Sequence, residues 1–250
     1  ISTALARIQN HLELKNHRDR LQRMVEAQIQ ETIESHMTTI FAMSKLAESR
    51  DDETGLHLER TRQYCRLLAS RLLECGRCSD VVDEEFVERI YQTSPLHDIG
   101  KVAIPDSVLK KPGKLTNSEF EIMKTHTLRG AETLASVTAI HPRNQFLNLG
   151  LQIARSHHEK WDGSGYPDRL RGSEIPLAAR IMAVADVYDA LTSKRCYKEA
   201  MTHAEARQIL VSQRGYHFEP LLIDTFLEIE PEFAKVLLIY QAQGVHCSEV

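Results

Sequence analysis

The sequence predicts an all-α protein: a helical bundle preceded by a long, coiled-coil-like N-terminal helix. Apolar residues recur at helical intervals along most of the 250 residues, and no stretch shows the alternation typical of a half-buried strand. Charged residues form 26% and hydrophobic residues 42% of the chain, as in an ordinary globular protein that can bury a sizeable core. We expect eight or nine helices and no internal repeat.

The first predicted element is one long helix from Leu5 to Leu46, which contains neither proline nor glycine. Its apolar side chains repeat at helical spacing. A stripe on so long a helix has little partner surface nearby, which favours a coiled-coil connector that forms a homodimer. The alternative is a helix folded back on the following domain. The striped residues are Leu5, Ile8, Leu12, Leu21, Met24, Ile29, Ile33, Met37 and Ile40.

We expect a connector over residues 1–47 and a second, helical domain over 48–250. Turn signals divide the second domain at 76–80, 111–116, 161–176 and 194–202. Thr116 with Glu119, and Thr202 with Glu205, have the spacing of capping boxes that begin new helices.

Charge and hydropathy exclude two classes of partner. A net charge of −4 lacks the basic excess of a general nucleic-acid binder, so no DNA partner is expected. No run approaches the roughly 18 apolar residues that span a bilayer, and no signal peptide opens the chain, which predicts a cytoplasmic protein without a membrane span. Ile1 opens the chain within a helical pattern, which indicates a fragment of a longer protein.

Histidines and carboxylates gather near the ends of apolar helical runs. Their nitrogen and oxygen donors, without thiolates, suit Fe, Mn, Zn, Ni or Co better than Ca or a structural zinc. Taken singly, each of these residues has an ordinary structural explanation. Asp189, three residues after the candidate Asp186, is interpreted as an acid on a helix surface. The candidate ligands are Glu53, His57, His97, Asp98, His126, His157, His158 and Asp186.

Eight candidates exceed what one ion can use while it also holds water or substrate. We therefore expect two ions roughly 3.5–4 Å apart, as in two-metal phosphoester-cleaving sites, where water is activated by its lowered pKa. Asp98 could bridge them. Since neighbouring helical residues point about 100° apart, we expect His157 and His158 to serve different ions.

A phosphodiester substrate also needs cations near its oxygens. Lys101 follows Asp98 by three residues, and Arg195 and Lys198 follow the Asp186 helix. We expect these three to contact phosphate, whereas Arg180 is interpreted as a solvated surface charge.

The stretch "WDGSGYP", residues 161–167, follows the paired histidines directly. Its glycines permit positive φ, and Pro167 pushes Tyr166 toward extended geometry. A plain connecting turn would explain this composition, but the position predicts a loop over the metals.

These motifs together resemble the HD-GYP subgroup of the HD phosphohydrolase superfamily. The resemblance covers about residues 48–230 and rests on their order: "RDDETGLH", "LHDIGKVAIPD", "KPGKLT", "KTH", "HHEKWDGSGYP", "AVADVYDALTSKRCYK" and "RGYHFEP". One departure is the segment between His57 and His97, which is longer than in many members and leaves the fine substrate preference open.

The resemblance implies an HD fold, a site of two or three divalent ions (iron or manganese, with Ni, Co or Zn as alternatives) and hydrolysis of cyclic di-GMP to pGpG or GMP. It implies the eight ligands above, with Glu53 associated with a third metal. Asp98 and Lys101 would be catalytic. Lys101, Arg195 and Lys198 would contact phosphate, and Gly165, Tyr166 and Pro167 would form the loop over the substrate.

The N-terminal residues look like the end of a receiver domain, which implies a two-component response regulator as the parent protein. Other substrates, 3′,3′-cyclic GMP-AMP or pGpG, stay open because metals and phosphate contacts do not distinguish bases. A non-catalytic dinucleotide receptor, a docking module that contacts signalling proteins through the loop, and a generic HD nucleotidase are the competing hypotheses.

Overall fold

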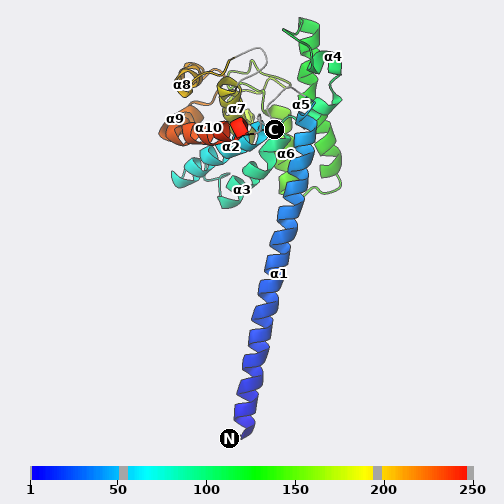
Figure 1. Cartoon of the computed structure of the whole chain (residues 1–250), viewed down its shortest axis with the longest axis vertical. Coiled ribbons are helices and arrows are strands. Elements are labelled where there is room, and N and C mark those ends of the chain that lie inside the picture. The colour runs from blue at the N-terminus through cyan, green and yellow to red at the C-terminus, as the bar shows by residue number, and fades with distance from the viewer. Residues whose placement is uncertain (1, 51–55, 194–198, 247–250) are drawn as a thin grey trace. The chain divides into compact units, whose positions relative to one another are not determined.

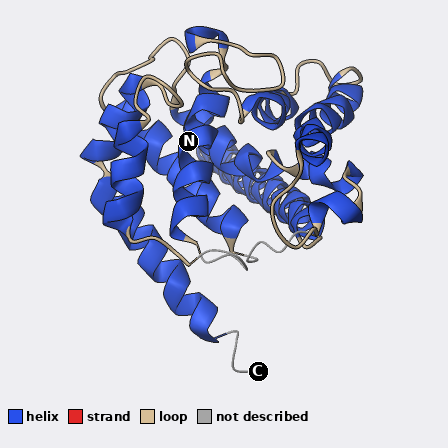
Figure 2. Cartoon of the chain, turned by 90° about the horizontal axis from the view of Figure 1, so that it is seen from above, coloured by secondary structure: helices blue, strands red, loops and turns tan. Residues whose placement is uncertain are grey.

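The computed structural model describes residues 2–50, 56–193 and 199–246. Within these ranges the chain forms ten α-helices and three 3₁₀ helices, and no strand (Figure 2). The helices are α1 (Ser2–Glu48), α2 (His57–Glu74), α3 (Glu84–Thr93), η1 (Ser94–Leu96), η2 (Ile99–Ala103), α4 (Asp106–Leu109), α5 (Asn117–Thr138), α6 (Gln145–Ser156), η3 (Gly172–Glu174), α7 (Leu177–Thr192), α8 (His203–Ser212), α9 (Pro220–Glu228) and α10 (Glu230–His246) (Figure 1). The all-α prediction is confirmed, with slightly more helices than expected.

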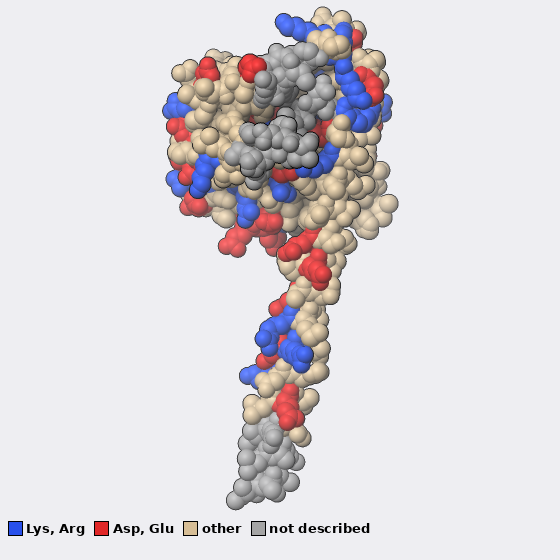
Figure 3. Space-filling model, viewed as in Figure 1, with Lys and Arg blue, Asp and Glu red and all other residues tan. Residues whose placement is uncertain are grey.

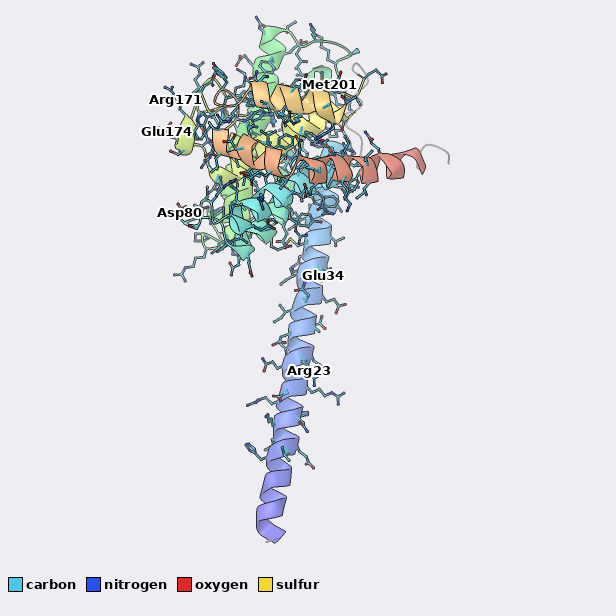
Figure 4. All side chains as sticks on the ribbon, turned by 90° about the vertical axis from the view of Figure 1, so that its left-hand side faces the viewer. Arg23, Glu34, Asp80, Arg171, Glu174 and Met201 are labelled. Carbon is cyan, nitrogen blue, oxygen red and sulfur yellow. The ribbon has the colours of Figure 1, made fainter. Side chains whose placement is uncertain are left out.

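The chain divides into two compact units, Ile1–Met43 and Ser44–Val250. The first consists of most of α1, the predicted long helix. Acidic and basic residues are interspersed along it (Figure 3), and Arg23 and Glu34 project outward from it (Figure 4). Its apolar side chains are also open to solvent, with Leu14 exposed to 69% and Met24 to 58%.

Glutamines and glutamates one turn apart stabilise α1 locally. Gln22 Nε2 donates to Glu26 Oε1 at 3.0 Å, and Gln30 Nε2 donates to Glu34 Oε1 at 2.9 Å. Such pairs support a helix that packs little of its own surface. No helix within the described ranges combines the length and the hydropathy needed to cross a bilayer.

The core of the second unit lies around α7, which is apolar on nearly all sides and therefore buried. It packs against α2, α6, α8 and α9. Aromatic rings fill the space between α2, α7 and α10: Tyr64 stacks on Phe233 with centroids 4.6 Å apart, and Tyr188 meets both rings edge-on at 5.1 Å. This core fixes the positions of α2 and α7, which carry His57 and Asp186.

Both predicted capping boxes are confirmed. Thr116 and Glu119 begin α5, and Thr202 and Glu205 begin α8, each pair with reciprocal side-chain and backbone hydrogen bonds. Lys111 adds an ion pair to Glu119 at 2.6 Å. In the long loop between α6 and α7, the backbone N–H of Arg171, the N-cap of η3, donates to the side chain of Glu174, the last residue of η3 (Figure 4).

A glycine lets η2 approach α5 closely. A Cβ at Gly100 would lie 2.0 Å from the backbone oxygen of His126, so no other residue fits without moving the backbone. Arg50 holds η2 from the other side: its guanidinium donates to the carbonyl oxygens of Val102 and Ile104 and to Asp106 at 2.6 Å. These contacts set the position of the turn that carries Asp98 and Lys101.

Candidate metal centre

The structure brings seven of the eight predicted ligands together in two neighbouring groups. In each group the donor atoms lie within 4.8 Å of one another. The eighth candidate, Glu53, lies outside the described residues. Group one comprises Asp98, His126, His157 and His158, and group two comprises His57, His97 and Asp186.

Group one gathers donors from three elements. Asp98 immediately precedes η2, His126 lies on α5, and the two adjacent histidines follow the end of α6. Asp98 Oδ1 lies 3.2 Å from His126 Nε2 and 3.6 Å from His157 Nε2. One carboxylate oxygen therefore faces two imidazole nitrogens.

Group two lies where α2, η1 and α7 meet. His57 Nε2 is 3.4 Å from His97 Nε2 and 3.8 Å from Asp186 Oδ1. The second oxygen of Asp98, Oδ2, lies 3.3 Å from His97 Nε2. Asp98 thus directs one oxygen to each group, which is the placement that a carboxylate bridging two ions requires.

Hydrogen bonds at the far nitrogens fix the histidine tautomers. The Nδ1 atoms of His97, His126 and His157 lie 2.9, 2.8 and 3.0 Å from backbone carbonyl oxygens. A carbonyl oxygen only accepts, so each Nδ1 carries the proton, and in the neutral ring the lone pair is on Nε2. All three lone pairs therefore point into the centre.

The inward atoms make the centre fit a cation. Asp98 Oδ1, His126 Nε2 and His157 Nε2 are buried without a hydrogen-bond partner among the described residues. Burying polar acceptors without a donor is costly. Several acceptors aimed at one another form a cluster that a divalent ion would satisfy, and their mixture of imidazole and carboxylate suits a transition metal.

The electrostatics keep Asp98 and His158 in the state that binds metal. Burial opposes ionisation of Asp98, but Lys101 and the surrounding histidines hold the pKa of its carboxyl well below its usual range. Burial, together with His157 and His126, holds the pKa of His158 well below its usual value. A charged carboxylate therefore faces a neutral imidazole.

The expectation that His157 and His158 serve different ions differs from the geometry, because both lie in group one. Their ring centroids are 4.0 Å apart. His157 is the C-cap of α6 and His158 follows in a turn, so the 100° separation of helical neighbours does not apply to this pair.

Asp189 is a residue of the candidate site that the sequence interpretation missed. It is buried, not at the helix surface: its side chain is 1% exposed, and Oδ2 accepts from His57 Nδ1 at 2.7 Å. Arg60 donates to both of its oxygens, at 2.6 and 2.8 Å. Burial opposes ionisation of Asp189, but the hydrogen bonds from Arg60 and His57 lower its pKa. Its spacing of three from Asp186 was the signal available.

Asp189 orients a candidate ligand without belonging to either group. A carboxylate that accepts a proton from the far nitrogen of a histidine fixes the tautomer and makes the near nitrogen a stronger donor. Ser193 joins the same network, since Arg60 donates to its hydroxyl at 2.7 Å.

The predicted basic residues have different positions. Lys101 Nζ lies 2.8 Å from Asp98 Oδ2, at the edge of the centre. Arg195 and Lys198 lie outside the described residues. The interpretation of Arg180 as a solvated charge is wrong. Its side chain is 14% exposed, pairs with Glu219 at 2.6 Å and donates to the carbonyl oxygen of Ile175 at 2.8 Å. Arg180 therefore connects the segments that precede α7 and α9.

The predicted loop packs against group one. Tyr166 lies beside His158 with ring centroids 4.9 Å apart, and its N–H donates to the His158 carbonyl oxygen at 3.2 Å. Gly165 allows this, since a Cβ there would lie 2.3 Å from the backbone nitrogen of Lys160. The peptide bond between Tyr166 and Pro167 is cis.

A buried carboxylate anchors the far end of the loop. Glu159 Oε1 accepts from the backbone N–H of Asp168 at 2.6 Å. Arg155 then pairs with the Asp168 side chain through two bonds of 2.7 and 2.8 Å. The loop is therefore tied to α6, the helix that ends in the paired histidines.

The chain matches the HD domain family over residues 42–222. It is 46% identical over 212 residues to a cyclic di-GMP phosphodiesterase of Vibrio cholerae. The aligned region covers 85% of this chain and 43% of that protein. It is 42% identical to a 3′3′-cGAMP-specific phosphodiesterase 2 of the same organism (81% and 36% covered). It is also 42% identical to the cyclic di-GMP phosphodiesterase response regulator RpfG of Xanthomonas campestris (92% and 60%).

A solved structure shares the fold. The cyclic GMP-AMP specific phosphodiesterase V-cGAP3 of V. cholerae aligns with a TM-score of 0.54 and 21% identity, over 79% of this chain and 50% of that one. The chain thus spans about half the length of the proteins that it resembles.

Proposed function

The chain belongs to the HD domain family, and from that premise we propose that it is a metal-dependent phosphodiesterase that hydrolyses cyclic di-GMP to pGpG, GMP or both. The observation that carries the proposal is the pair of ligand groups joined by Asp98. Two adjacent cation sites suit a phosphodiester because both the attacking and the leaving oxygen need charge stabilisation.

The cofactors in this proposal are two or three divalent ions, iron or manganese, with Ni, Co or Zn as alternatives. When bound, they would polarise the phosphoryl oxygens and lower the pKa of water. The described residues would hold two ions: group one the first and group two the second. Glu53 would serve a third.

The chain's own residues would do the rest of the chemistry. Asp98 would bind both metal ions from its position between the two groups. Lys101, whose Nζ lies 2.8 Å from Asp98, would place positive charge beside the reacting phosphate. Arg195 and Lys198 would contact the other phosphate oxygens. Gly165, Tyr166 and Pro167 would cover the substrate from the side of His158.

A second substrate is favoured by one observation. The 3′3′-cGAMP-specific phosphodiesterase 2 of Vibrio cholerae is 42% identical to this chain. A preference for that dinucleotide is therefore the competing form of the same activity. Linear pGpG is a third candidate, because the metal and phosphate contacts are the same.

Further partners belong to this proposal as well. α1 exposes its apolar stripe and suits a homodimer; a receiver domain upstream is supported by the resemblance to a response regulator. The loop at 165–167 would contact other signalling proteins. We place the protein in the cytoplasm, where cyclic dinucleotides act as messengers.

The test is turnover of anaerobically prepared protein loaded separately with Fe, Mn, Ni, Co and Zn. Cyclic di-GMP, 3′,3′-cyclic GMP-AMP and pGpG compete in one reaction, and chromatography resolves the products. We expect cyclic di-GMP to be consumed first. Absence of turnover of every substrate with every metal would refute the proposal, and faster loss of cyclic GMP-AMP would establish the second candidate.

A further inference from the structure

An aromatic residue on α5 extends the row of rings that begins at the metal centre. Tyr166 lies 4.9 Å from the ligand ring of His158, and Phe120 meets Tyr166 edge-on, at 6.2 Å and 82°. Phe120 is on the same helix as His126, which belongs to group one. The ring is therefore held at a fixed position just outside the centre.

Phe120 leaves much of its surface to solvent, with 46% of the residue exposed. One exposed aromatic residue is ordinary in a soluble protein. What distinguishes Phe120 is its surroundings: Tyr166 supports one side, and Tyr166 itself lies beside the ligand histidine His158. A flat apolar surface at the rim of a phosphodiester site suits a nucleobase, because a base is separated from its phosphate by only one ribose.

A cation lies over both rings. Lys124 Nζ is 5.4 Å from the centroid of Phe120 and 5.7 Å from that of Tyr166. It also pairs with Glu121 at 2.6 Å, but an ammonium has three N–H donors. Lys124 can thus donate to a ligand while its ion pair stays intact.

We propose that Phe120 and Lys124 form the base-binding part of the site: Phe120 stacks on one guanine of the cyclic dinucleotide, and Lys124 donates to O6 or N7 of that guanine. Stacking occurs with any base. Selection comes from Lys124, since guanine offers two acceptors on that edge, whereas adenine offers N7 beside an amino donor. The inference rests on the proposed function and adds which residues recognise the base.

The test compares F120L, F120Y and K124Q with wild type and with I122A. Ile122 is a matched control: it lies on the same helix, is 41% exposed, and points about 200° away from Phe120. Three quantities are measured: KM and kcat for cyclic di-GMP and cyclic di-AMP, the Kd of each by anisotropy of a labelled analogue, and metal content.

We expect F120L to raise Kd and KM for cyclic di-GMP about tenfold, within the 5- to 150-fold range of base stacking on an aromatic ring. Metal content should stay at the wild-type level. F120Y keeps an aromatic face and should weaken binding much less than F120L, and I122A should bind as wild type does. K124Q should weaken binding of cyclic di-GMP about fivefold or more and weaken binding of cyclic di-AMP less, so that the guanine preference falls.

The outcomes separate the two claims. If wild type turns over cyclic di-GMP and F120L matches it, the base-binding inference is overturned and the function stands. If wild type binds the dinucleotide without cleaving it, the function fails and the Kd series alone decides the inference. Absence of binding to wild type overturns both.

Discussion

The two ligand groups differ in what orients their histidines. In group one, His126 and His157 donate through Nδ1 to neutral backbone carbonyls. In group two, His97 also donates to a backbone carbonyl, but His57 donates to the charged carboxylate of Asp189, which Arg60 holds in turn. A carboxylate partner makes an imidazole a stronger metal donor than a carbonyl partner does. The difference teaches that two neighbouring sites built from the same residue types can hold their ions with unequal strength.

Removing the residue shared by both groups gives the largest expected effect. D98N keeps the shape of the side chain but replaces its charge with an amide, whose N–H₂ would face either group. We expect loss of metal from both groups and hydrolysis at background level. The control is D80N, at an exposed aspartate in the turn that follows α2. Metal analysis and turnover check the pair, and a D98N enzyme that retains full metal would contradict the shared role.

A displaced 161–167 loop would disturb group one, because Tyr166 in this loop lies beside His158. In G165A the new Cβ would overlap the backbone nitrogen of Lys160, so the loop has to move. A shift of about 1 Å in a positioned group can cost about 100-fold in rate, and we expect a loss of that size in kcat/KM.

G113A is the comparison for this variant, because Gly113, unlike Gly165, has a positive φ, and a Cβ there would meet nothing within 4 Å. It should lose stability without a comparable loss of rate. Equal rates for G165A and wild type would show that the loop does not position substrate.

Group two alone is tested by D189N. We expect metal affinity there to fall about 10- to 100-fold, the usual effect of removing an outer partner of a ligand histidine. D224N is the matched control, because Asp224 also forms two bonds with an arginine, Arg214, but at the surface. Metal titrations should show one weakened site in D189N and none in D224N. Equal weakening of both sites would remove the contrast between the groups.

The smallest effect lies far from the centre, at the start of α5. Hydrogen bonds from Lys111 and Thr116 lower the pKa of Glu119 from 4.5 to about 2. Because the folded pKa is depressed, its stabilisation is complete above pH 4.5 and is lost as the pH falls toward 2. The Tm difference between wild type and E119Q should therefore be largest near neutral pH and shrink across that window. A Tm difference independent of pH would contradict this assignment.

The sequence was sufficient for the features that depend on local pattern. The long helix, the all-α class and both capping boxes follow from spacing within one helix or turn, and the structure confirms them. The closeness of the seven described ligands was also expected, because His-Asp and His-His pairs lie at the ends of helices that pack together.

What the sequence could not provide depends on contacts between distant segments. Asp189 and Arg60 are 129 residues apart, and nothing local indicates their bond. Arg180 and Glu219 are 39 apart, so the charge of Arg180 suggested solvent. His157 and His158 were assigned to different ions because helical geometry was assumed past the last turn of α6.

Metal content of two ligand variants and their double mutant tests the central claim most directly. H126A breaks group one, H57A breaks group two, and metal per chain is measured in anaerobically prepared wild type, each variant and H57A/H126A. The account predicts that each single variant loses one ion and that the double variant loses two. A single variant that loses all of its metal, or a double variant that loses none, would contradict two adjacent and separable metal sites.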